Sequence, residues 1–212
     1  SIETPNLSSN IYYTLDGSEP QFSEGGSTKL YSAPVSIFTT TCLRFRATAT
    51  GHIESDIITH TYLFLNDVIG QPQNPGGFPR NWGHTGLGDY AMDPDVVDDS
   101  KYASTIIDDM KSIPSLSLVM DVDDWFKEGG QGIYIDGELD ERSVSAEFLH
   151  PDGGQGFQEN CAVMIVGGSS TRRWKSDKLS MRLKFKGEYG ASKLVYPFFG
   201  LDYLLEFNTL VL

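Results

Sequence analysis

The sequence predicts a mainly β protein, in which a small immunoglobulin-like β-sandwich precedes an α+β part built from an antiparallel sheet and helices. Three observations predict this class. The 22 glycines and 10 prolines among 212 residues indicate many turns. Short β-prone runs fill the first third of the chain, and helical spacing begins only near residue 100. A hydrophobic share of 39% supplies a core and excludes wholesale disorder.

The first third contains β-prone runs separated by turn signals. The predicted strands are residues 11–15, 34–38, 42–50 and 57–65. Asp16-Gly17 is a strong turn signal after the first of them, and Gly25-Gly26 and Gly51 separate the others. This order of short strands, without any helical period, is typical of a small sandwich.

Residues 66–90 are rich in Gly, Pro and Asn, as linkers are. The segment nevertheless carries Phe78, Trp82 and Tyr90, which a flexible tether does not need. We expect it to lie across the second part and to cap part of its core. A binding role stays open, because long irregular loops are uncommon unless they are functional.

The second part begins with a predicted helix that Asp99 or Ser100 caps and Pro114 ends. Its apolar positions recur at helical spacing: Tyr102, Ile106, Met110 and Ile113. Further elements are predicted along the remaining chain: a buried strand at 116–120, a helical turn at 121–127, strands at 132–136 and 144–149, and a hairpin at 161–186.

The hairpin carries the sharpest functional signal. Side chains alternate across a strand, so one face collects polar and cationic groups: Lys178, Ser180, Arg182, Lys184 and Lys186. The other face collects Leu179, Met181, Leu183 and Phe185. A Gly-Gly-Ser-Ser turn at 167–170 can offer backbone N–H groups beside these cations. The pattern suits a phosphate-bearing ligand, and a solvated edge face is the alternative.

The formal net charge is −13, which disfavours binding to nucleic acid or to an anionic membrane. No apolar run approaches the roughly 20 residues of a membrane span. The charge is uneven, since residues 161–212 carry eight Lys and Arg against four Asp and Glu. The basic end and the acidic middle either frame a cleft or form solvated surface.

No catalytic residue or metal ligand is assigned from the sequence. Cys42 and Cys161 lie in apolar runs and are expected to be buried free thiols, and no Cys/His spacing fits zinc. The acidic clusters at 93–99 and 121–124 lack the calcium-loop pattern, so helix caps are favoured. The hydrolase motif Gly-x-Ser-x-Gly is absent.

The runs IYYTLDGSEP, LYSAPVSI and TTTCLRFRATATGHIESDIITHTY follow a distinctive order. They resemble the chitobiase/β-hexosaminidase C-terminal-type module, over about residues 8–65. The resemblance implies an accessory domain of an extracellular or cell-surface bacterial protein, often beside carbohydrate-active partners. We therefore expect a sandwich module at 1–65, a connecting segment at 66–90 and a second part at 91–212.

The second part contains SIPSLSLVMDVDDWF, ERSVSAEFLHPDG and KLSMRLKFKGEYGASKLVYPFFG in order. Residues 86–212 resemble the opening part of the CotH kinase-like family, which implies an atypical kinase fold that binds ATP with Mg or Mn. The resemblance assigns the nucleotide phosphates to Gly167, Gly168, Ser169, Ser170, Lys178 and Arg182. The chain departs from the family in two ways. One Arg that the family commonly has before the paired glycines is missing, since Met164 and Val166 stand in that region. The family's catalytic and metal-binding carboxylates lie beyond Leu212.

The sequence-based expectation is therefore a piece of a longer, secreted bacterial CotH-like polypeptide. Its kinase-like part resembles an ATP-phosphate-binding lobe and is expected to be inactive by itself. The alternative is a non-catalytic extracellular structural or adhesive protein whose partner is a protein or a cell-surface polysaccharide. Neither hypothesis requires nucleic acid or a membrane span.

Overall fold

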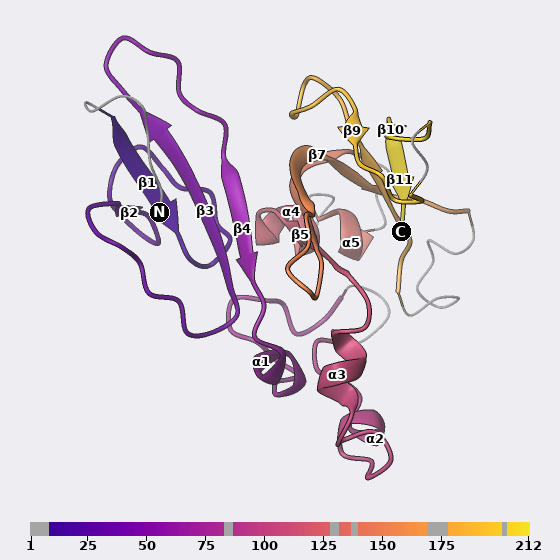
Figure 1. Cartoon of the computed structure of the whole chain (residues 1–212). Coiled ribbons are helices and arrows are strands. Elements are labelled where there is room, and N and C mark those ends of the chain that lie inside the picture. Colours follow the sequence, from indigo (N-terminus) through magenta and orange to yellow (C-terminus); the bar gives the residue numbers. More distant parts are fainter. Residues whose placement is uncertain (1–8, 83–86, 128–131, 137–139, 169–177, 201–202) are drawn as a thin grey trace.

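A computed structural model describes residues 9–82, 87–127, 132–136, 140–168, 178–200 and 203–212. This part of the chain is mainly β, with antiparallel sheets and a few short helices (Figure 1). That architecture is consistent with the β-sandwich character that the sequence predicts. Two larger sheets meet near the middle of the molecule, and a small two-stranded sheet lies near the C-terminus.

The first sheet has four antiparallel strands in the order β2-β1-β3-β4. Their bounds are β1 Asn10–Thr14, β2 Lys29–Leu30, β3 Thr41–Thr48 and β4 Ile58–Tyr62. The Asp16-Gly17 turn is confirmed: Gly17 has a φ of 81°, and its N–H donates to the carbonyl of Cys42 at 3.1 Å. The predicted strand at 34–38 is wrong. Pro34 lacks the N–H that a ladder needs, and Phe38 is 81% exposed.

The helices are all one to two turns long: α1 Leu65–Ile69, α2 Pro94–Val97, α3 Ile106–Met110, α4 Val122–Phe126 and α5 Ile133–Asp136. The predicted helix after Asp99 is mostly turns, and only its second half is α3. The predicted strand at 132–136 is wrong, because this segment forms α5. In a strand with one solvent-facing side, alternate residues would be exposed, but Ile133, Tyr134 and Ile135 are all buried.

The second sheet has five antiparallel strands in the order β11-β8-β7-β6-β5. Their bounds are β5 Ser115–Val119, β6 Arg142–Leu149, β7 Phe157–Ile165, β8 Met181–Lys184 and β11 Thr209–Val211. The two-stranded sheet pairs β9 Leu194–Val195 with β10 Glu206–Phe207. The strands predicted at 116–120 and 144–149, and the hairpin at 161–186, are confirmed as β5, β6 and β7–β8 within the described residues.

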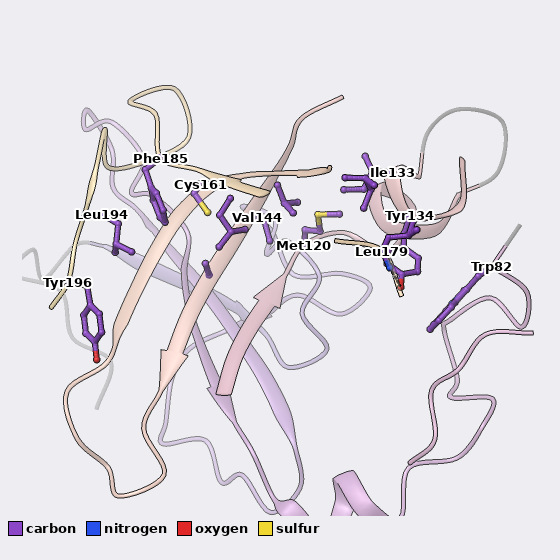
Figure 2. Close-up of a cluster of buried hydrophobic side chains, with 14 residues drawn as sticks. Trp82, Met120, Ile133, Tyr134, Val144, Cys161, Leu179, Phe185, Leu194 and Tyr196 are labelled. Carbon is purple, nitrogen blue, oxygen red and sulfur yellow. Dashed lines mark hydrogen bonds between the residues drawn. The ribbon is translucent and has the colours of Figure 1, made fainter. Parts of the chain in front are cut away.

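The core lies on one face of the second sheet. Val144, Cys161, Val163 and Leu183 there are at most 2% exposed. Figure 2 shows this cluster running from Tyr196 and Leu194 at one end to Tyr134 and Trp82 at the other. The structure thus places the apolar stripes of three adjacent strands together, as alternation requires.

The connecting segment caps this core, as predicted from its aromatic residues. Trp82 is buried and stacks on Phe126, with ring centroids 5.9 Å apart and planes 6° apart. Its indole N–H donates to the Tyr90 hydroxyl at 2.7 Å, and that hydroxyl donates to the carbonyl of Pro79 at 2.8 Å. The described residues of the segment are therefore held by packing and by hydrogen bonds.

Both cysteines are free thiols, in agreement with the sequence-based expectation. Cys161 is fully buried, and burial raises its pKa to about 12. Cys42 is only half-buried, and burial also raises the pKa of its thiol. Neither thiol is therefore activated as a nucleophile.

The two larger sheets meet where the edge strand β4 lies against β6 and β7. The backbone N–H of Thr61 donates to Oε2 of Glu147 at 2.6 Å. The side-chain amide of Asn160 donates to the carbonyl of Ile57 at 2.8 Å. Glu147 alternates with core residues, so it projects from the face of the second sheet opposite the core. Side chains of this polar face thus satisfy the backbone of an edge strand.

Replacing Glu147 with Ala should weaken this junction. The half-buried Thr61 N–H would lose its acceptor, and we expect a loss of about 1 to 3 kcal/mol in the free energy of unfolding. Urea denaturation followed by circular dichroism measures it. Glu188→Ala, at an exposed carboxylate, is the matched control and should change little. Equal effects of the two substitutions would contradict the role assigned to Glu147.

Candidate anion-binding site

The candidate site lies at the open end of the β7–β8 hairpin. The two strands pair Met164 with Arg182 and Ile165 with Met181. The pairing continues beyond the strands, since the N–H of Val166 donates to the carbonyl of Ser180 at 3.0 Å. Continued two residues further, this register would bring Gly168 opposite Lys178. Two of the predicted phosphate ligands therefore lie just beyond the paired ends of the two strands.

The backbone at this end of the hairpin is specialised. Gly167 has a φ of 125°, a conformation that side-chain-bearing residues rarely adopt. Among the residues that the structure describes, none lies within 4 Å of a Cβ built on Gly168. Ser169 and Ser170, the other predicted turn ligands, lie outside the described residues.

The predicted alternation along the second strand of the hairpin is confirmed. Leu179, Leu183 and Phe185 are buried on the core side. On the opposite face Lys178 and Lys186 are exposed, whereas Arg182 and Lys184 are half-buried. The strand therefore presents its cations away from the core, as the sequence pattern requires.

Arg182 is half-buried in the middle of this face. It lies between Met164 on β7 and Val211 on β11, both of which are its register partners. Its Nε is buried and has no hydrogen-bond partner among the residues that the structure describes. A buried N–H without an acceptor is costly, so an anion that reached this atom would be stabilised.

The structure adds a residue that sequence reasoning missed. Glu141, just before β6, accepts hydrogen bonds from Lys184 Nζ and Lys186 Nζ, each at 2.6 Å. These two ammonium groups lower the pKa of Glu141. The hydrogen bond to Glu141 raises the pKa of Lys186 in turn. A carboxylate of the chain itself thus pairs with two of the lysines on the cationic face.

No pattern in the sequence pairs Glu141 with these lysines, because the contact depends on how β6, β7 and β8 are ordered. Lys184 lies opposite Ala162, and Ala162 lies opposite Ser143. Glu141 precedes Ser143 by two residues and therefore shares its face. The contact could be predicted only by knowing the strand order, which is a property of the tertiary structure.

The acidic clusters act as helix caps, as predicted. Asp93 accepts the N–H of Asp95 at the start of α2, and Asp121 accepts the N–H of Asp123 at the start of α4. In the described ranges, no three His, Cys, Asp or Glu side chains come together so as to hold a metal ion. The same portion of the chain contains no helix with the length and apolarity that crossing a membrane requires.

Comparison with known proteins finds a match only for the part of the chain that contains the first sheet. Residues 1–62 match the family model described as Fn3 associated. This match identifies a small β domain of the kind associated with fibronectin-type modules, and it ends before the candidate site begins. No curated protein and no solved structure matches the chain significantly.

The ion pairs of Glu141 should make stability depend on pH. The folded-state pKa of Glu141 lies below the ordinary value of 4.5, so its stabilisation is present above that value and is lost as the pH falls through the folded-state pKa. Glu141→Gln should therefore be less stable than the parent chain near neutral pH.

Urea denaturation from neutral pH to about pH 3 tests this expectation. The difference in unfolding free energy between the parent and Glu141→Gln should shrink towards zero in acid. Glu188→Gln serves as the control for a general charge effect. A difference that stays constant over the whole pH range would contradict the ion-paired role of Glu141.

Proposed function

We propose that residues 91–212 form a phosphate-binding part of a CotH kinase-like lobe that recognises ATP. The module before it, of the chitobiase/β-hexosaminidase C-terminal type, would act as an accessory domain of the same secreted bacterial protein. The observation that supports this best is the β7–β8 pairing, which runs to Val166 and Ser180 and would bring Gly168 and Lys178 together if it continued. The proposal makes the protein extracellular or cell-surface.

The chemistry of the hairpin end suits a phosphate group. Backbone N–H groups of a glycine turn form a concave donor site, and a lysine ammonium adds a mobile point charge. Arg182 adds a guanidinium whose Nε has no described partner. By sequence alternation Lys178 and Arg182 fall on the same face, so their long side chains could contact two phosphates of one nucleotide.

The described residues offer no group of side chains that would bind the Mg or Mn ion of an ATP complex. Mg or Mn would offset the charge of the phosphates, yet the carboxylates that the structure places do not converge on a metal ion. Phosphoryl transfer also needs a base aligned with the acceptor, and no residue here is assigned that role. The proposal is therefore limited to binding and includes no transfer step in this chain.

A second candidate function is that of a structural or adhesive surface protein. Glu141 already compensates Lys184 and Lys186, which leaves less positive charge for an anionic ligand. The hydrogen bonds of Glu147 and Asn160 also hold the two sheets together, as a spacer would need. In this alternative the kinase-like part is a scaffold.

Titration with ATP in the presence of Mg or Mn separates the two candidates. If the first is correct, isothermal calorimetry should detect binding by the whole chain, and Lys178→Ala should weaken it by about 10- to 100-fold. Lys193→Ala is the matched control, because Lys193 is exposed, carries an ion pair with Glu206 and lies outside the hairpin. It should leave the affinity unchanged.

Micromolar binding that survives Lys178→Ala would remove the role of this lysine. An absence of binding at millimolar ATP, with no nucleotide effect on the melting temperature, would favour the scaffold alternative. Inorganic triphosphate in place of ATP shows whether the phosphates alone are recognised.

A further inference from the structure

A pocket of about 410 Å³ lies at the junction between the first sheet, the connecting segment and α4. Its volume falls in the range of small-molecule sites. Three separate segments line it: the turn at 16–18 with Cys42, residues 76–78, and residues 118–122 with Trp125. It lies apart from the hairpin end, because none of its lining residues belongs to the candidate anion-binding site.

The polar lining accepts hydrogen bonds and carries negative charge. Asp16 and Asp121 contribute carboxylates from two different walls, and the lining includes no Lys or Arg. Partial burial opposes ionisation of Asp16, but hydrogen bonds from Ser18 and Ser27 lower its pKa overall. Both carboxylates therefore disfavour an anionic guest and favour one that donates hydrogen bonds.

The remaining lining is largely apolar and includes two aromatic rings. Phe78 is 47% exposed, and Trp125 is half-buried on α4. Val119 and Met120 lie between these rings and the turn of the first sheet in the lining of the same pocket. A guest that matches this surface needs an apolar face as well as donor groups at its edges.

The turn at 16–18 is held close to the second sheet. A Cβ added at Gly17 would come within 3.2 Å of Cγ1 of Val119, so only glycine allows this approach. On the opposite side, added Cβ atoms at Gly76 and Gly77 would meet nothing within 4 Å. The pocket therefore has one tightly packed wall and one open wall that faces solvent.

We infer that this pocket binds a sugar ring of a neutral polysaccharide. A pyranose ring presents hydroxyl donors around its edge and C–H groups on its faces, which match two acceptor walls and an aromatic surface. The open glycine wall lets a polymer continue into solvent. The inference stands independently of phosphate binding at the hairpin.

Calorimetric titration of the whole chain with neutral oligosaccharides tests the inference. The panel consists of cellotetraose, xylotetraose, mannotetraose and the tetramer of N-acetylglucosamine. At least one should bind with a submillimolar Kd. Trp125→Ala should weaken that binding about tenfold or more, through loss of the stacking surface.

Asp121→Asn supplies a second variant that keeps the helix cap and removes the charge. It should weaken binding about fivefold, since a hydrogen bond to a carboxylate is stronger than one to a neutral acceptor. Phe38→Ala, at an exposed aromatic residue outside the pocket lining, is the control and should leave the affinity unchanged. Lys178→Ala should also have no effect, which separates this inference from the phosphate proposal.

Three results would overturn the inference. The first is that none of the four oligosaccharides binds at millimolar concentration. The second is binding that neither Trp125→Ala nor Asp121→Asn weakens, which would place the sugar elsewhere. The third is Trp125-dependent binding of tetramethylammonium by a chain that binds no oligosaccharide, which would assign the pocket to a cation.

Discussion

The arrangement of the two larger sheets depends on a buried carboxylate that accepts a backbone N–H. Glu147 is only 8% exposed, and its hydrogen bond from Thr61 replaces the partner strand that β4 lacks on its outer side. The hydroxyl groups of Thr61 and Ser117, 2.7 Å apart, lie beside it. Because an edge strand with unpaired backbone is a liability, this contact protects β4 and joins it to the second sheet.

Much of the fold followed from local pattern. The turn at Gly17, the strands of the β7–β8 hairpin and the caps of the acidic clusters were predictable, because each depends on residues near one another in sequence. The two opposite faces of β8 were predictable for the same reason, with Leu183 on the core side and Arg182 and Lys184 on the other. Trp82 was expected in the core because an exposed linker does not need so large an apolar ring.

The failures came from tertiary context. Ile133, Tyr134 and Ile135 read as a strand, yet they form a helical turn that buries all three against the sheet. The contacts of Glu141 and Glu147 bring together residues from different strands, and no spacing rule predicts them. The junction pocket likewise needs three segments that only the folded chain combines. Sequence reasoning thus predicted the cationic face of the hairpin but could not find Glu141, which pairs with two of its lysines.

The strict alternation along β8 has a consequence for how the protein tolerates change. If β8 shifted by one residue relative to β7, Leu183 would face solvent and Lys184 would face the hydrophobic core. Burying the lysine and exposing the leucine would both cost free energy, so the observed register is favoured. The register of β7 with β8 is therefore set by the burial of one face, whatever the polar face carries.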